Sequence, residues 1–128
     1  MNIETSANEY FGLLSVDAEG AMRKFYADDV KMKMNWDLET EEYDLDIEGI
    51  ENAVQAIIQF TQGLKSHFQQ QVLALTFDQE QNASQLRVRQ QYSHQEFGDV
   101  NIEALLTHYW ENGKIIEERF EVVPGKGE

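Results

Sequence analysis

The chain has 128 residues, 24 acidic and 10 basic side chains, a formal net charge of −14 and no cysteine. This length fits one domain, and the missing cysteines exclude disulfides and thiolate metal sites. A strongly negative chain is repelled by phosphate backbones and anionic lipid surfaces, so neither nucleic acid nor membrane is expected as a partner. The N-terminal sequence lacks the basic start and apolar run of a secretory signal, which predicts a cytoplasmic location.

The periodicity of apolar residues predicts two short helices, two strands and a longer helix in the first half of the chain. Residues 7–14 show helical spacing, and Asp17 is placed to cap a second helix whose apolar residues run to Tyr26. From Asp29 to Trp36 the period changes to two, and it is again two over residues 43–48, which predicts two strands. A third and longest helix is expected after Gly49, with its apolar face over residues 50–64.

Four further extended runs, at 67–78, 85–97, 100–111 and 114–123, complete the predicted domain. Asn112-Gly113 is a strong signal for a two-residue hairpin, because a type I′ turn needs positive φ at both central positions, and Gly98-Asp99 is a weaker one. Helices segregated from a run of strands are typical of an α+β protein. We therefore expect a curved, mostly antiparallel sheet wrapped around the long helix, in one domain over 1–123 followed by a flexible tail at 124–128.

Three segments carry a resemblance to a known superfamily. They are YFGLLSVDAEGAMRKFYADDV, the IEGIENAVQAI entry to the long helix, and HYWENGKI near the end. Together they resemble the nuclear transport factor 2-like superfamily, in its SnoaL-like and ketosteroid isomerase-like branch. The resemblance covers nearly the whole chain and implies a cone-shaped α+β fold. It leaves the function open, because the superfamily holds isomerases, dehydratases, cyclases, hydrolases, transport factors and non-enzymatic binding modules.

Ketosteroid isomerase is the informative relative in this resemblance. Tyr10 matches the tyrosine of the first helix that donates a hydrogen bond to the oxyanion in that enzyme. Its general-base aspartate would fall at Met34, and its protonated acid at Thr107, so both carboxyl groups are missing here. Without a base at the α-carbon, no group carries the proton across a dienolate. The resemblance therefore implies the fold and does not predict a steroid isomerase.

The two predicted turns set a register for the last three strands. With Gly98-Asp99 and Asn112-Gly113 as two-residue turns, Gln90 lies opposite Thr107, which lies opposite Glu118 on the next strand. Aromatic and aliphatic side chains flank this polar row, so this face is the predicted pocket lining. The predicted ligand-binding residues are Tyr26, Met34, Val88, Gln90, Tyr92, Leu105, Tyr109, Ile116 and Phe120.

Four residues are candidate catalytic groups: Glu118, Tyr10, Thr107 and His94. A carboxylate among apolar neighbours is a credible general acid or base, although Glu118 at a wet sheet rim would have no such role. Tyr10 is either an oxyanion donor or a core tyrosine with a satisfied hydroxyl. His94 is predicted opposite Glu103, either as an oriented acid-base pair near the cavity mouth or as a surface cross-strand pair.

The opposite sheet face is predicted to be an interface. It carries Trp110 among apolar neighbours, which is a large surface to leave in water. Members of the superfamily commonly dimerise through this face. We therefore expect a homodimer through the outer sheet face, at Ala104, Leu106, His108, Trp110 and Ile115.

No cofactor and no metal ion are expected. Eight carboxylates lie between Asp37 and Glu51, but their alternation with apolar residues is typical of the solvated side of an edge strand, and no EF-hand spacing is present. The three histidines show no metal-ligand spacing, and there is no Gly-rich phosphate loop.

Two functions remain open at this point. The first is a SnoaL-like domain that holds a small, largely apolar organic molecule and uses cofactor-free acid-base chemistry for isomerisation, dehydration or cyclisation. Glu118 would move the proton and Tyr10 would donate to an oxyanion, while Thr107 and Gln90 orient the substrate. The alternative is a non-catalytic binding or protein-interaction module whose cavity is filled by its own side chains. Collapse around Met34, Tyr92 and Phe120 would leave no substrate site.

Overall fold

The computed structural model describes residues 3–35 and 45–123, which form three helices and one six-stranded sheet. The helices are α1 (Ile3–Leu14), α2 (Ala18–Phe25) and α3 (Ile50–Gln62), and the strands are β1 (Tyr26–Asn35), β2 (Leu45–Glu48), β3 (Gln69–Asp78), β4 (Ala83–His94), β5 (Gly98–Glu111) and β6 (Lys114–Val122). Each predicted helix and strand is present. Residues 36–44, which include parts of two predicted strands and most of the acidic stretch, and the predicted tail at 124–128 lie outside the described residues.

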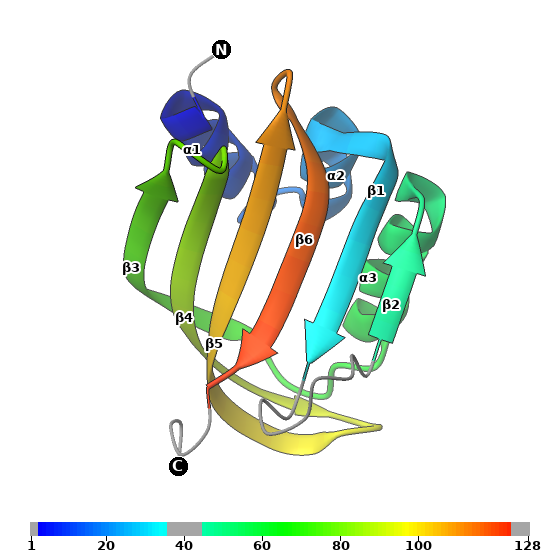
Figure 1. Cartoon of the computed structure of the whole chain (residues 1–128). Coiled ribbons are helices and arrows are strands. Elements are labelled where there is room, and N and C mark those ends of the chain that lie inside the picture. Colours follow the sequence, from blue (N-terminus) through cyan, green and yellow to red (C-terminus); the bar gives the residue numbers. More distant parts are fainter. Residues whose placement is uncertain (1–2, 36–44, 124–128) are drawn as a thin grey trace.

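The sheet follows the order β2-β1-β6-β5-β4-β3, and of its described strand pairs only β1 with β6 is parallel. Figure 1 shows a curved, open sheet with the three helices on one side, and α3 running beside β1 and β2. The predicted α+β class, with a curved and mostly antiparallel sheet, is confirmed. Among the described residues, no helix is long and apolar enough to cross a membrane.

The two short helices are held by a side-chain cap at the start of α2 and by a shared aromatic core. The side chain of Asp17 accepts a hydrogen bond from Gly20 N–H at 2.9 Å, which satisfies a free donor at the start of α2. Tyr10 of α1 packs edge-on against the rings of Phe25 and Trp110. This contact joins both short helices to β5, so the N-terminal helices and the sheet share one core.

The predicted turn at Gly98-Asp99 is wrong. His94 pairs with Gly98, so residues 95–97 form a three-residue loop, and Gly98 has a φ of +74°. This left-handed conformation is one that glycine adopts without a steric penalty. Gly98 therefore follows the loop as the first residue of β5 instead of lying at the centre of a turn, and Val88 lies opposite Ala104 rather than Tyr109.

The turn at Asn112-Gly113 is confirmed, but a bulge follows it. Both residues have positive φ, 52° and 76°, and Glu111 pairs with Lys114. Trp110 then pairs with Ile115 while the preceding Tyr109 pairs with Glu117, so one extra residue lies in β6. As a result, Thr107 lies opposite Arg119 and not opposite Glu118 as predicted.

The three-residue loop reverses the predicted faces of β5 and of β6 as far as the bulge, and the bulge restores the predicted face of the rest of β6. The five residues assigned to the dimer interface are not on an outer face: Ala104, His108, Trp110 and Ile115 are buried in the chain's own core, and Leu106 lines its cavity. These residues are therefore not available for the predicted dimer interface, and the homodimer itself stays a prediction. Leu105, Thr107 and Tyr109 lie on the outer face instead, and Ile116 is exposed.

Candidate functional site

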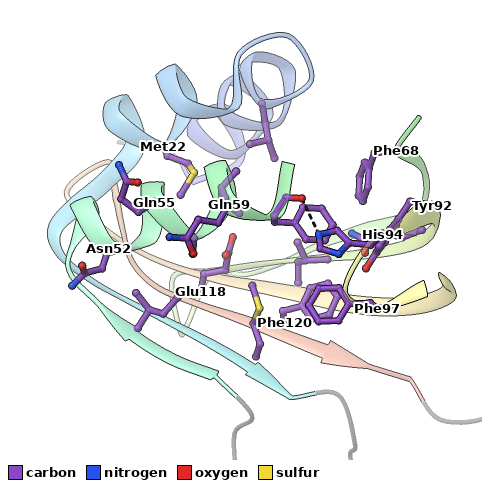
Figure 2. Close-up of a pocket in the computed structure, with 18 of the residues that line it drawn as sticks. Met22, Asn52, Gln55, Gln59, Phe68, Tyr92, His94, Phe97, Glu118 and Phe120 are labelled. Atoms are coloured by element: carbon purple, nitrogen blue, oxygen red, sulfur yellow. Dashed lines mark hydrogen bonds between the residues drawn. The ribbon is translucent and has the colours of Figure 1, made fainter. Parts of the chain in front are cut away.

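A cavity of about 580 Å³ lies between α3 and the inner face of the sheet. Its walls are mainly apolar and aromatic, with a small number of polar groups. Figure 2 shows Asn52, Gln55 and Gln59 along α3, and Glu118 projecting from β6 below them. A concave, mostly apolar space of this size with few polar groups is the usual form of a small-molecule site.

The polar group at the base of the cavity is a buried network around Glu118, whose side chain is 9% exposed. The Tyr26 hydroxyl donates to Glu118 Oε1 at 2.9 Å, and His108 Nε2 lies 2.7 Å from the same oxygen. Because Tyr26 uses its proton for Glu118, the Tyr10 hydroxyl, 3.2 Å away, donates to the Tyr26 oxygen. The chain of donors thus runs from two phenols and one imidazole to one carboxylate oxygen.

The second oxygen of Glu118, Oε2, has no such donor among the described residues. Both hydrogen bonds between Glu118 and the described residues end on Oε1, while the side chain lines the cavity. Oε2 is therefore left for the contents of the cavity. A carboxylate held by one oxygen and open at the other can accept a ligand hydrogen bond or a proton.

The two tyrosines of the network are held as neutral phenols. Burial raises the pKa of Tyr10 well above its ordinary value, and the negative charge of Glu118 raises it further. The pKa of Tyr26 is raised for the same two reasons, burial first and Glu118 second. Both hydroxyls therefore stay donors throughout the neutral pH range, which keeps Oε1 of Glu118 saturated.

His94 is fully bonded and lies at the aromatic end of the cavity. Its Nδ1 accepts from Glu96 N–H at 3.0 Å, so Nε2 carries the proton and donates to the Phe60 carbonyl oxygen at 3.0 Å. The ring stacks on Phe60 and Phe97, with centroids 5.1 and 4.6 Å away. This arrangement fixes a neutral tautomer, and it gives His94 a structural role in shaping the cavity wall.

The predicted pairing of His94 with Glu103 is wrong. Glu103 lies opposite Arg89 and forms an ion pair with Arg87 at 3.2 Å. The cause is the three-residue loop before Gly98, which changes the partner of every residue in β4.

Gly63, at the end of α3, is expected to accept a side chain only at a cost, because His94 beside it is hydrogen-bonded at both ring nitrogens and stacked on two rings. A Cβ built on Gly63 would lie 2.3 Å from His94 Nε2. We expect Gly63→Ala to lower the free energy of unfolding by about 1–2 kcal/mol, measured by denaturant unfolding. Gly12→Ala is the matched control: nothing lies within 4 Å of its Cβ position in α1, so it should raise stability by about 0.5–1 kcal/mol. Equal effects of the two substitutions would contradict this account.

The structure brings together eight of the predicted site residues and separates five from them. The cavity is lined by Tyr10, Tyr26, Met34, Gln90, Tyr92, His94, Glu118 and Phe120. Val88 is on the inner face but is fully buried beside the cavity. Leu105, Tyr109 and Ile116 do not line it. Thr107 is on the outer face, where its hydroxyl accepts from Gln85 Nε2 at 3.3 Å, so it cannot orient a substrate in the cavity.

Met34, Tyr92 and Phe120 line an open cavity and do not collapse into it. Sequence reasoning missed His108, which it placed on the outer face, and the aromatic rings of Phe60, Phe68 and Phe97. It also missed the amides of Asn52, Gln55 and Gln59. These amides recur at helical spacing, which places them on one face of α3. That spacing was the signal in the sequence from which a polar wall of the cavity could have been predicted.

Comparisons with known proteins give the fold. No protein-family model matches the sequence, and no curated protein is similar to it at a significant level. A candidate SnoaL-like polyketide cyclase from Mesorhizobium loti superimposes with a TM-score of 0.78 at 24% identity, over 94% of this chain and 98% of that one. An NTF2-like protein of unknown function from Burkholderia pseudomallei gives a TM-score of 0.76 at 8% identity, over 96% and 92% of the two chains.

A candidate ketosteroid isomerase from Kribbella flavida superimposes with a TM-score of 0.69 at 18% identity, over 96% of this chain and 78% of that one. The three likenesses cover 94–96% of this chain. The resemblance carried by the three sequence segments is therefore confirmed at the level of the fold, and the chain has the cone-shaped α+β fold of the nuclear transport factor 2-like proteins.

Proposed function

We propose that this chain binds a small, largely apolar organic molecule in its cavity, with Glu118 as the polar anchor. The observation that carries the proposal is the half-occupied carboxylate: Oε1 of Glu118 is held by Tyr26 and His108, and Oε2 is left to the cavity. The volume of about 580 Å³ lies within the usual range for small-molecule sites. Folds of this type also occur in candidate cyclases and isomerases.

The chemistry that Glu118 supplies without a cofactor is proton transfer. A ligand with an acidic C–H or O–H placed at Oε2 would lose its proton to Glu118, which is the first step of an isomerisation, dehydration or cyclisation. Neighbouring amides on α3, Gln55 and Gln59, can donate N–H groups to an oxygen that becomes negative. This is the catalytic form of the proposal.

A non-catalytic binding module is the second candidate, and one observation favours it. The Tyr10 hydroxyl, which the resemblance implied as an oxyanion donor, donates to Tyr26 and is almost completely buried. No phenol of the network is then free to stabilise an oxyanion. Deuterium incorporation at the α-carbon of 1-tetralone, followed by mass spectrometry, separates the two roles: a base at Oε2 accelerates the exchange, and a binding module leaves it at the solvent rate.

Binding is tested with 2-naphthol and its methyl ether, 2-methoxynaphthalene, by fluorescence titration. A hydrogen bond to a carboxylate contributes about 1.5–3 kcal/mol, so 2-naphthol should bind at least about tenfold more tightly than the ether. Glu118→Gln should remove most of this preference.

The matched control is Glu117→Gln. Glu117 is the adjacent residue of β6, and its carboxylate pairs with Arg119 away from the cavity. That variant should bind both probes like the unaltered chain. Failure of both probes to bind, or an unchanged preference in Glu118→Gln, would refute the proposal.

A further inference from the structure

Among the described residues, the carboxylates that line the cavity are not matched by a lysine or an arginine. Of the described residues that line it, Glu118 and Glu96 carry carboxylates, and none is a lysine or an arginine. The whole chain carries a formal charge of −14, so the surrounding field attracts cations and repels anions.

The partners of Glu118 do not neutralise its charge. Tyr26 is a neutral phenol, and His108 has a buried Nδ1 without any hydrogen-bond partner among the described residues. A protonated imidazole would place an unsatisfied N–H at that atom, so the geometry fits a neutral ring with its proton on Nε2. A buried carboxylate with no cationic partner is unfavourable, and a positive charge placed at its open oxygen relieves that cost.

The rest of the cavity suits an apolar body that ends in an ammonium group. Phe60, Phe68 and Tyr92 form a cluster with centroids 5.2 to 6.0 Å apart, and Figure 2 shows aromatic side chains at the end of the cavity away from Asn52. Their faces accept both apolar groups and cations. Gln59 projects toward Glu118 from α3 in Figure 2, and its amide oxygen can accept a further ammonium N–H.

We propose that the ligand of this cavity is an organic cation, a protonated amine on a flat apolar body, with the amine at Glu118 and the body among the aromatic rings. The inference rests on the proposed binding function and adds the charge of the ligand to it. The same charge inventory is unfavourable for ligands that carry a carboxylate or a phosphate.

Three naphthalene probes of similar shape and different charge test the inference by isothermal titration calorimetry at neutral pH. They are 2-naphthylmethylamine, which is a cation, 2-naphthylmethanol, which is neutral, and 2-naphthoate, which is an anion. We expect the amine to bind at least about tenfold more tightly than the alcohol, the value for one charge-assisted contact. The anion should bind more weakly than the alcohol.

Variants assign the effect to Glu118. Glu118→Gln should lower the affinity of the amine more than that of the alcohol, so that the preference for the amine is mostly lost. Glu117→Gln removes one negative charge, as Glu118→Gln does, but should keep the preference for the amine. This comparison separates the local contact at Glu118 from the electrostatic field of the whole chain.

The outcomes separate failure of the cation inference from failure of the proposed binding function. If none of the three probes binds, the proposed binding function fails. If the alcohol binds as tightly as the amine, or if the amine keeps its advantage in Glu118→Gln, the cation inference is overturned and the binding function stands.

Discussion

Replacing Trp110 with alanine is expected to lower the free energy of unfolding by about 3–5 kcal/mol, the usual cost of truncating a buried tryptophan. The side chain is 3% exposed, and its indole Nε1–H donates to Ser84 Oγ at 3.0 Å. Its ring meets Tyr10 and Phe25 edge-on, with centroids 6.2 Å away in both cases. The substitution leaves a cavity between both short helices and the sheet, and it leaves the Ser84 hydroxyl without this donor. Circular dichroism during denaturant unfolding measures the loss.

Tyr109→Ala is the matched control, because Tyr109 is the preceding residue of β5 and lies on the outer face. Its ring is half-buried and is covered by the Arg119 guanidinium at 5.2 Å. We expect its loss to lower stability by less than half as much as the loss of Trp110, since part of the ring is already in water. If both hairpins had two-residue turns and no bulge, Tyr109 would lie inside and Trp110 outside, and the loss of Tyr109 would then lower stability more than the loss of Trp110. A larger effect at Tyr109 would therefore contradict the observed pairing of β5.

The sequence was sufficient to predict the elements, because each has a strong local signal. The two short helices have apolar faces at helical spacing, and Asp17 has the side chain of an N-cap where one is needed. Asn112-Gly113 fits a type I′ turn so well that few alternatives compete. These signals operate over a few residues and do not depend on tertiary contacts.

Strand register was not predictable in the same way, because single-residue events decide it. The loop that ends at Gly98 and the bulge beside Trp110 each reverse the face of every following residue. Alternation could not correct the error, since Leu105 and Leu106 are adjacent, and so are Tyr109 and Trp110. Both faces of β5 thus carry large apolar side chains.

Glu118 was correctly predicted on the cavity side because two errors in the predicted register cancel at this residue. The predicted turn placed Thr107 inside, and the missing bulge then placed Glu118 beside it. In the structure His108 is inside, and the bulge brings Glu118 opposite it. The cavity side of β6 was thus predicted correctly for Glu118 and Phe120, which follow the bulge, and wrongly for Ile115 and Ile116 before it, while the partner that holds Glu118 was assigned to the wrong face. The burial of His108 on β5 can be predicted only when the pairing of β5 with its neighbours is known.

Replacing His108 with leucine is expected to lower the free energy of unfolding by about 1.5–3 kcal/mol, the range for a hydrogen bond to a charged group. The ring is completely buried, and its Nε2 is 2.7 Å from Glu118 Oε1. Leucine fills most of the space and removes the donor. Glu118 reaches the cavity with Oε2, so water there offsets part of the loss. Denaturant unfolding measures the change, and His67→Leu, at an exposed histidine, should change stability by less than about 0.5 kcal/mol.

A double-mutant cycle with Glu118→Gln identifies the cause of that loss. If His108 stabilises a carboxylate, removing the charge first makes the loss of His108 smaller, and the two substitutions should couple by about 1–3 kcal/mol. Additive effects within about 0.5 kcal/mol would mean that Glu118 is held as a neutral acid. The cycle therefore also tests the proposed charge of the ligand. An ionised Glu118 without a cationic partner would favour a cationic ligand, whereas a neutral carboxylic acid at the base of the cavity would give no such preference.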